Sequence, residues 1–323
     1  MTATSIEPQS DLRGKNRAAD RGFRWATYAA GGFVLLVLTA IAVTMTRKAW
    51  PAFDEMGFHF FTSKRWAPNE NVFGARALIF GTLYTAVIAL VLAVPVSIGI
   101  ALFATQVAPT RLRRWIVSVV DLLAVIPSVV FGLWAILFLA PKLPGFFQIV
   151  HDIFGPIPLI GRIFGGPPYS GRSFFTAGVI LAVMITPIIT SLSREVIDTT
   201  PPSDREAAYG LGATRWEMIR GAVLPHSKGG LVGAVMLGLG RAMGETVAVA
   251  LAIGSSKAIG LNIFSSGDTM PAVIANEWGE ATGTYQAALI ALAVTLFALT
   301  IIVNLAATAI VQRSIAKSSG VRR

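Results

Sequence analysis

Arg241 and Glu245 are two charged residues in an otherwise apolar and glycine-rich stretch, GLGRAMGETVAV, at residues 238–249. In a continuous helix, their four-residue spacing places both side chains on one face, where they can pair with each other. The planar guanidinium of arginine also matches the oxygens of a tetrahedral oxyanion, which a nearby carboxylate can displace. Ionisable residues inside a membrane favour function, so we predict a transient oxyanion site here. The alternative is a purely structural ion pair beside glycines that admit a neighbouring helix.

The composition places these charges in a membrane protein. Of 323 residues, 54% are hydrophobic and only 14% are charged, which is far from the balance of a soluble domain. The absence of cysteine excludes disulfides and thiolate catalysis, and the three histidines are too far apart in sequence to predict a metal site. No nucleophile and base pair or paired carboxylates stand out, so we do not expect an enzyme.

Six apolar segments are long enough to cross a bilayer, since about 20 residues at about 1.5 Å each span a core of about 30 Å. We therefore expect an all-α, polytopic integral membrane protein whose spans pack as one domain over residues 25–311. The predicted spans are Trp25–Thr46, Ala77–Thr105, Trp115–Ala140, Ser173–Leu192, Gly229–Gly254 and Tyr285–Val311. Three prolines inside them are predicted to kink their helices without ending them, namely Pro95, Pro127 and Pro187.

The distribution of positive charge predicts the orientation, because Lys and Arg are retained on the cytoplasmic side of a membrane. With the N-terminus inside, 17 of the 27 Lys and Arg residues fall in cytoplasmic segments and nine in outer connections. We therefore place both tails, residues 1–24 and 312–323, in the cytoplasm. The net charge of +10 follows from these short basic segments facing anionic membrane lipid, so nucleic acid is not needed as a partner.

Two of the outer connections have a distinctive amino-acid composition. Residues 49–76 mix aromatic and charged side chains, which suits a segment at the membrane interface. Residues 141–172 are rich in proline and glycine, and their apolar pieces are too short to cross. We expect a surface hairpin there rather than a re-entrant pore loop.

The cytoplasmic connection at residues 193–228 carries signals for a pair of short helices. Ser203 and Glu206 have the spacing of a capping box, and glycines at positions 210 and 212 can end the helix that they open. Thr214 and Glu217 repeat this spacing before a second short helix, which we expect to close before Pro225. Taken alone, such a pair is more often a plain surface element than a docking site.

The same connection resembles the EAA loop of bacterial ABC-importer permeases, written E-A-A-x3-G-x9-I-x-L-P. Ala222 stands where isoleucine is usual. In that family the loop docks onto a cytoplasmic ATPase subunit. The resemblance implies this coupling role for Glu206, Ala207, Ala208, Gly212, Leu224 and Pro225. The chain has no G-x-x-x-x-G-K-[ST] loop, so we expect no cofactor on this chain, with ATP and Mg²⁺ bound by a partner.

The string GRAMGETVAV resembles the G-R-A-x-G-E-T signature of phosphate-specific ABC permeases of the PstC type. The resemblance implies a six-span, type I importer permease in a bacterial inner membrane that works by alternating access. Its implied partners are a second permease of the PstA type, a PstB-type ATPase dimer and an external PstS-type phosphate-binding protein. Arg241 and Glu245 would lie on the phosphate path, with Thr246 as a hydroxyl contact. Alternatives are a sulfate or molybdate permease, or an ion-coupled secondary transporter.

Overall fold

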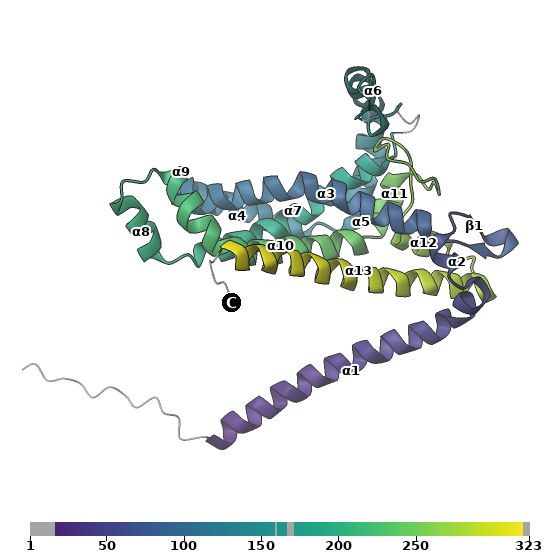
Figure 1. Ribbon diagram of the computed structural model, residues 1–323, viewed down its shortest axis with the longest axis horizontal. Coiled ribbons are helices and arrows are strands. Elements are labelled where there is room, and N and C mark those ends of the chain that lie inside the picture. The colour runs from purple at the N-terminus through teal and green to yellow at the C-terminus, as the bar shows by residue number, and fades with distance from the viewer. Residues whose placement is uncertain (1–16, 159, 167–170, 319–323) are drawn as a thin grey trace, which may run out of the picture. The chain divides into compact units, whose positions relative to one another are not determined.

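The computed structural model describes residues 17–158, 160–166 and 171–318, which form two compact units (Figure 1). One unit ends at Lys48 and contains most of helix α1 (Arg17–Met56), a 40-residue helix with an apolar stretch long enough to span a membrane. The other unit begins at Ala49. Residues 1–16 and 319–323 of the two predicted tails lie outside the described residues.

Six helical segments in the described part of the chain are long and apolar enough to cross a membrane, as predicted. They are Asp20–Met56, Arg76–Val107, Ser128–Phe154, Phe174–Asp198, Arg215–Gly244 and Gly283–Ala309. All six overlap their predicted spans, and the third begins at Ser128 instead of the predicted Trp115. The predicted fold class, an all-α polytopic membrane protein, is confirmed.

Helix α7 (Phe174–Asp198) is the central helix of the bundle. It packs against α3 (Arg76–Leu102), α4 (Thr110–Val125) and α10 (Leu224–Gly244), while α13 (Gly283–Ser318) packs on α10 (Figure 1). The large side chains that α7 buries fully are Phe174, Ile180, Leu181, Ile185, Ile189 and Ile197. Because α7 is buried against several neighbours, it is the fixed element against which the interrupted helices are placed.

The third predicted span is interrupted at Pro127, where the sequence predicts only a kink. Helix α4 ends at Val125, Ile126 and Pro127 are extended (ψ 125° and 141°), and α5 (Ser128–Trp134) begins after them. Proline disfavours helical backbone at the residue before it and has no amide hydrogen to continue the ladder. Elsewhere, α3 and α7 continue through their prolines at positions 95 and 187, as predicted.

Beyond α5, the helical path continues through η3 (Ala135–Leu139) and η4 (Ala140–Lys142) into α6 (Leu143–Phe154), which stands away from the bundle in Figure 1. A short turn, η5 (Ile160–Arg162), follows. Residues 141–172 therefore include a regular helix and are not the simple hairpin that we expect from the sequence. The proline in the first turn of α6 causes no break, because the amides of a first turn have no intrahelical partner.

The end of the bundle near α12 (Met270–Glu277) is closed by a second hydrophobic core (Figure 1). Helix α2 (His59–Thr62) and an antiparallel hairpin precede α3. The hairpin consists of β1 (Trp66–Ala67), η1 (Pro68–Glu70) and β2 (Val72–Phe73), with Trp66 opposite Phe73. Phe60, Trp66 and Phe73 are buried against α12 and α13. Part of residues 49–76 is thus anchored in this core, while Trp50 and Phe58 remain exposed, and a position of the segment at the membrane interface stays a prediction.

The opposite end of the bundle carries α8 (Pro202–Gly210) and α9 (Arg215–Met218), which connect α7 to α10 (Figure 1). A wide π-helical turn, η6 (Ile219–Val223), joins α9 directly to α10, and a similar turn, η2 (Phe103–Val107), ends α3. The prediction of a short helix pair is therefore confirmed, although its second helix does not close before Pro225. Pro225 lies at the start of α10, directly after the π-helical turn η6, so it does not end the helix.

Candidate functional site

The fifth predicted span is interrupted at the residues that the sequence singles out. Helix α10 ends at Gly244, Glu245 has extended backbone (φ −71°, ψ 130°), and α11 (Val247–Ile253) begins after Thr246. Glycine and β-branched residues are weak helix formers, so this stretch is a local weak point in the helix. Non-helical backbone within a membrane is tolerated only where it is buried in protein or lines a water-filled cavity.

Arg241 and Glu245 do not pair in the structure, although a continuous helix would allow them to. Arg241 is exposed in the last turn of α10, whereas Glu245 is half-buried beyond the helix end. No ion pair or hydrogen bond among the described residues joins them. Residues four apart share a face only while a helix continues, so the interruption at Glu245 explains why the two side chains do not meet. Arg241 instead lies at the negative end of the α10 dipole, and the Thr246 hydroxyl donates to the Gly244 carbonyl at 3.2 Å.

The interrupted fifth span packs against the interrupted third span. At the contact between α5 and α11, a Cβ added to Gly132 would lie 2.7 Å from Leu251 Cδ1 and 3.0 Å from Ala248 Cα. At about 1.5 Å per residue, Pro127 is about 8 Å along its helix from Gly132, and the start of α11 is closer still to Ala248. The two interruptions therefore lie beside one joint. Discontinuous helices packed in this way are a common construction of solute sites in transport proteins.

Arg172 caps the C-terminal end of α11. Its Nε donates to the Leu251 carbonyl at 3.1 Å and its Nη2 to the Ala250 carbonyl at 3.4 Å, and the Ser173 amide donates to the Ala252 carbonyl at 3.1 Å. The last carbonyls of a helix have no partner within the helix, so these donors fix where α11 ends. Sequence reasoning counts Arg172 only as a charge in an outer connection, because nothing local links it to residues 79 positions away.

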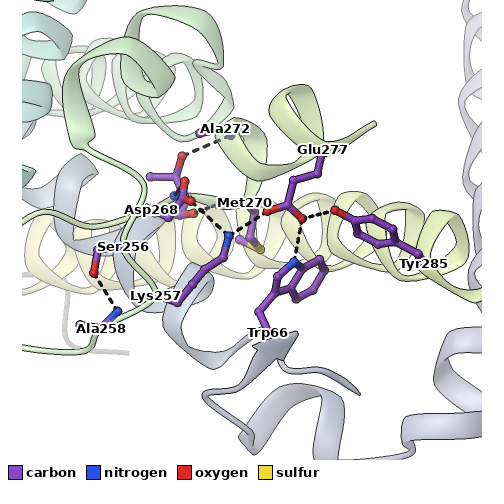
Figure 2. Close-up of polar contacts among 11 residues, drawn as sticks. Trp66, Ser256, Lys257, Ala258, Asp268, Met270, Ala272, Glu277 and Tyr285 are labelled. Atoms are coloured by element: carbon purple, nitrogen blue, oxygen red, sulfur yellow. Dashed lines mark hydrogen bonds and ion pairs between the residues drawn. The ribbon is translucent and has the colours of Figure 1, made fainter. Parts of the chain in front are cut away.

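A charged network beyond α11 is centred on Glu277 (Figure 2). Lys257 Nζ lies 2.9 Å from Glu277 Oε1 and 3.4 Å from Asp268 Oδ2. The indole nitrogen of Trp66 and the hydroxyl of Tyr285 each donate to Glu277 Oε2 at 2.7 Å. The network joins the hairpin, the segment after α11, the C-terminal end of α12 and the start of α13, and it thereby ties α11 to the second core.

Asp268 is the buried member of this network, with its side chain 2% exposed. Burial raises the pKa of the Asp268 carboxyl, and the Lys257 ammonium and the Thr269 amide, which donates at 3.0 Å, partly oppose that rise. Sequence reasoning missed the network. The usable signal was the single lysine of the last outer connection, followed by carboxylates at positions 268, 277 and 280 in the same stretch.

The α8–α9 pair has one of its two predicted caps. The Thr214 hydroxyl accepts from the Glu217 amide at 3.4 Å, and the Glu217 carboxylate accepts from the Thr214 amide at 2.8 Å, so this capping box is confirmed. Hydrogen bonds from Thr214 lower the pKa of the Glu217 carboxyl. The box predicted at Ser203 is wrong, because α8 begins at Pro202 and Ser203 is already inside the helix. Proline is preorganised for that first position.

The predicted coupling residues lie in two separate parts of the structure, α8 with the turn after it and the start of α10. Glu206 and Ala207 are exposed on α8, Ala208 is half-buried against the α9 side, and Gly212 has the left-handed φ of 82° that glycine adopts freely. Leu224 and Pro225 instead begin α10, where they line a groove with residues of α3.

Large apolar side chains are exposed on the α8–α9 pair, although sequence reasoning did not single them out. Leu211 is 90% exposed and Trp216 is 62% exposed, with Tyr209 beside them in sequence. Large apolar groups that are this exposed suit a surface that another protein covers. The sequence signal was an apolar or aromatic residue at each of these positions in a segment predicted to be polar and cytoplasmic.

The α8–α9 pair is attached firmly to the spans. Arg205 Nη2 donates to the Ile197 carbonyl of α7 at 2.9 Å. A small core joins Ala101 of α3, Ile197 of α7 and Leu231 of α10 to Met218 of α9. Force applied to this pair therefore reaches α3, α7 and α10 directly.

A helical membrane bundle with two interrupted spans and an exposed helix pair at one end is the construction of a transport subunit. Residues 93–315 match the family described as binding-protein-dependent transport system inner membrane component, and the chain belongs to this family. The phosphate transport system permease protein PstC of Xylella fastidiosa strain Temecula1 is 42% identical over 93% of this chain and 94% of its own length. The protein of that name from Mesorhizobium japonicum is 43% identical over 88% of this chain and 87% of its own length.

Solved structures share the fold. A bacterial alginate ABC transporter in complex with its pentasaccharide-bound periplasmic protein matches 93% of this chain and 99% of its own chain, with a TM-score of 0.57 and 18% identity. The MetNI methionine ABC transporter in an inward-facing form matches 74% of this chain and 94% of its own, with a TM-score of 0.53 and 17% identity.

Proposed function

We propose that this chain is a permease subunit of an ATP-driven phosphate importer in the bacterial inner membrane, forming the phosphate path with a second permease. The names of its relatives support phosphate as the solute. The observation that carries the proposal is the interruption at Glu245 and Thr246, with Arg241 exposed beside it. A charged group at this depth of a spanning segment needs water or a partner, and a second permease closing around a wet path supplies both.

The three residues at the interruption have distinct proposed roles. The Arg241 guanidinium binds two phosphate oxygens through paired N–H donors. The Glu245 carboxylate repels the same anion and so keeps its binding weak enough for release. The Thr246 hydroxyl is a third donor once it turns away from the Gly244 carbonyl that it contacts here.

The α8–α9 pair is proposed to dock onto a cytoplasmic ATPase dimer of the PstB type, which holds ATP and Mg²⁺. Leu211 and Trp216 would fill apolar pockets, the exposed Glu206 and Ala207 would contact the ATPase, and Ala208 would hold α8 against α9. Gly212 shapes the turn, while Leu224 and Pro225 pass the movement into α10. An external PstS-type protein delivers phosphate, and a PstA-type subunit completes the path. Both termini of this chain lie in the cytoplasm. Closure of the ATPase dimer then alternates access to the path.

The test is ATP-dependent uptake of labelled phosphate into proteoliposomes that contain the chain with its PstA-, PstB- and PstS-type partners. We expect Arg241→Gln to abolish uptake while the complex still assembles. Arg65→Gln is the matched control, because Arg65 is exposed and pairs only with Glu70 among the described residues. Uptake by Arg241→Gln at the rate of the control would overturn the assignment of the site.

Docking and orientation are tested separately. Leu211→Ser with Trp216→Ser should release the ATPase from the purified complex. Full retention of the ATPase would refute docking through these two side chains.

Because the chain has no cysteine, single cysteines introduced at Leu211 and at the exposed Leu261 report topology. In intact spheroplasts, an impermeant maleimide should label Leu261→Cys and spare Leu211→Cys. The reverse pattern would reject cytoplasmic termini.

A further inference from the structure

A cationic hollow and an apolar groove lie next to each other along α4. The hollow has a volume of about 440 Å³ and is lined by Arg111, Arg114, Trp115 and Ser118. The groove has a volume of about 680 Å³ and lies between α3, α4 and α7. Its lining is almost entirely apolar, and Trp115 belongs to both linings, so hollow and groove form one continuous surface with a charged end and an apolar end.

The positive charge of the hollow is unbalanced. Of the three arginines at the start of α4, Arg113 pairs with Asp198 of α7 at 2.5 Å. Arg111 and Arg114 have no hydrogen bond or ion pair with any described residue. Their three-residue spacing places them on one face of the helix. Cations near a helix N-terminus are unfavourable, and the first turn of α4 contains no acidic residue to offset them. A bound anion at the hollow would offset them.

We propose that hollow and groove together bind one anionic phospholipid, with its phosphate on Arg111 and Arg114 and an acyl chain in the groove. From Arg111 to Leu123, at the deep end of the groove, α4 rises about 18 Å, close to the thickness of one leaflet, which is about 15 Å. Trp115 lies between the two parts, as expected for an aromatic side chain at the boundary of headgroups and hydrocarbon. Clustered arginines at the boundary of a membrane attract anionic lipid heads.

The apolar part of the surface distinguishes a lipid from free phosphate. Inorganic phosphate would contact only the hollow and would leave the groove open to water. The groove has its own free space at Gly99 of α3, where an added Cβ would meet no atom within 4 Å. A leucine at this position would therefore occupy the groove without displacing the protein, and it would compete with an acyl chain.

The experiment measures lipids retained by the purified full-length chain in native mass spectrometry. The probes are phosphatidylglycerol and phosphatidylcholine with identical acyl chains, supplied in equal amounts. We expect the wild-type chain to retain one phosphatidylglycerol in preference to phosphatidylcholine. One arginine near an anionic headgroup gives about a fivefold preference, so Arg111→Gln with Arg114→Gln should lower the preference by about 25-fold. Lys64→Gln with Lys142→Gln removes the same amount of charge from exposed positions elsewhere and should leave the preference for phosphatidylglycerol unchanged.

The groove is tested with Gly99→Leu. This variant should lose the retained lipid although both arginines remain, whereas Gly145→Leu in α6, at another glycine with open space, should not. Equal retention of the two lipids by the wild type, or an unchanged preference in the double arginine variant, would overturn the proposal. So would displacement of the lipid by inorganic phosphate or by glycerophosphoglycerol at matched concentration, because either result assigns the site to a free anion. The readout does not involve transport, so it succeeds or fails independently of the proposed function.

Discussion

Gly132 of α5 and Ala248 of α11 lie so close that a Cβ on Gly132 would be 3.0 Å from the Ala248 Cα atom. This is a contact of backbone against backbone between two helices that each begin just after an interruption. With the Leu251 side chain also packed on Gly132, this joint has no spare room, and interiors packed at this density do not deform continuously. We infer that the two interruptions move as one unit when the proposed path changes its access.

The first prediction concerns this joint. Gly132→Leu should destabilise the protein by about 1–3 kcal/mol through overpacking, since the Leu251 side chain and the α11 backbone both have to shift. It should also lower phosphate uptake, because α11 would be displaced from the interruption. Gly145→Leu is the matched control, as its position is open. Thermal unfolding and uptake are measured together, and wild-type behaviour of Gly132→Leu in both would show that the joint is not tight.

A second prediction follows from the separation of Arg241 and Glu245. If they formed a structural pair, exchanging them (Arg241→Glu with Glu245→Arg) would restore transport that either single change removes. Because the helix ends between them and no bond joins them here, we expect the exchanged protein to stay as inactive as Arg241→Glu alone. The assay is phosphate uptake, with assembly of the complex confirmed by co-purification. Recovery of uptake would favour the structural pair.

Hydropathy predicts the spans well but does not detect the interruptions within them. Windows of about 20 apolar residues average over one or two non-helical residues, so Glu245 and Thr246 were assigned to a continuous helix. Proline is ambiguous in the same way. Pro95 and Pro187 lie within continuous helices, and Pro127 ends one. Which outcome occurs depends on whether neighbouring helices satisfy the freed carbonyls, and that is decided by packing.

Contacts between distant residues set a further limit. Thr214 and Glu217 are three residues apart, and their cap was predictable from the sequence. Trp66 and Glu277 are separated by 211 positions, and only the folded chain brings them together. The helix pair that carries the proposed coupling residues was predictable because its signals are local, but the exposure of Leu211 and Trp216 depends on which side of the pair the core covers.

The third prediction concerns the Lys257 network and its dependence on pH. Lys257→Gln removes the cation that faces the buried Asp268 carboxyl and Glu277, so stability should fall by about 1–3 kcal/mol near neutral pH. Burial raises the pKa of Asp268 above its unfolded value, and loss of Lys257 raises it further. A raised carboxyl pKa gives stability that is complete below the unfolded pKa and is lost as pH rises through the folded pKa.

The deficit in melting temperature of Lys257→Gln relative to the wild type should therefore be smaller in acid than at a pH above neutral. Adding Asp268→Asn to this variant should remove most of the pH dependence, because no buried carboxyl remains there to ionise. Lys64→Gln, at an exposed position, should behave as the wild type at both pH values. A deficit in Lys257→Gln that is equal at both values would contradict the assignment to Asp268.

The fourth prediction separates the cap that forms from the one that does not. Thr214→Ala removes the hydroxyl that accepts the Glu217 amide and should cost about 1 kcal/mol of local stability in α9. Ser203→Ala should be neutral, because Ser203 lies inside α8 and caps nothing. Amide hydrogen exchange over residues 215–218 measures the difference, and Thr214→Ser, which keeps the hydroxyl, should restore protection. Equal exchange in the Thr214→Ala and Ser203→Ala variants would show that the box contributes nothing.

The same cap has an expected pH dependence of opposite sign to that of Asp268. The Thr214 hydrogen bonds lower the pKa of Glu217, so the stability that they provide is present above the unfolded pKa and is lost as pH falls through the folded pKa. The difference in α9 stability between the wild type and Thr214→Ala should therefore become smaller in acid.

If α9 transmits force from a docked ATPase, Thr214→Ala should also lower the amount of phosphate taken up per ATP hydrolysed, because a fraying helix absorbs movement before it reaches α10. An unchanged ratio alongside weakened protection of α9 would place the force transfer on α8 alone.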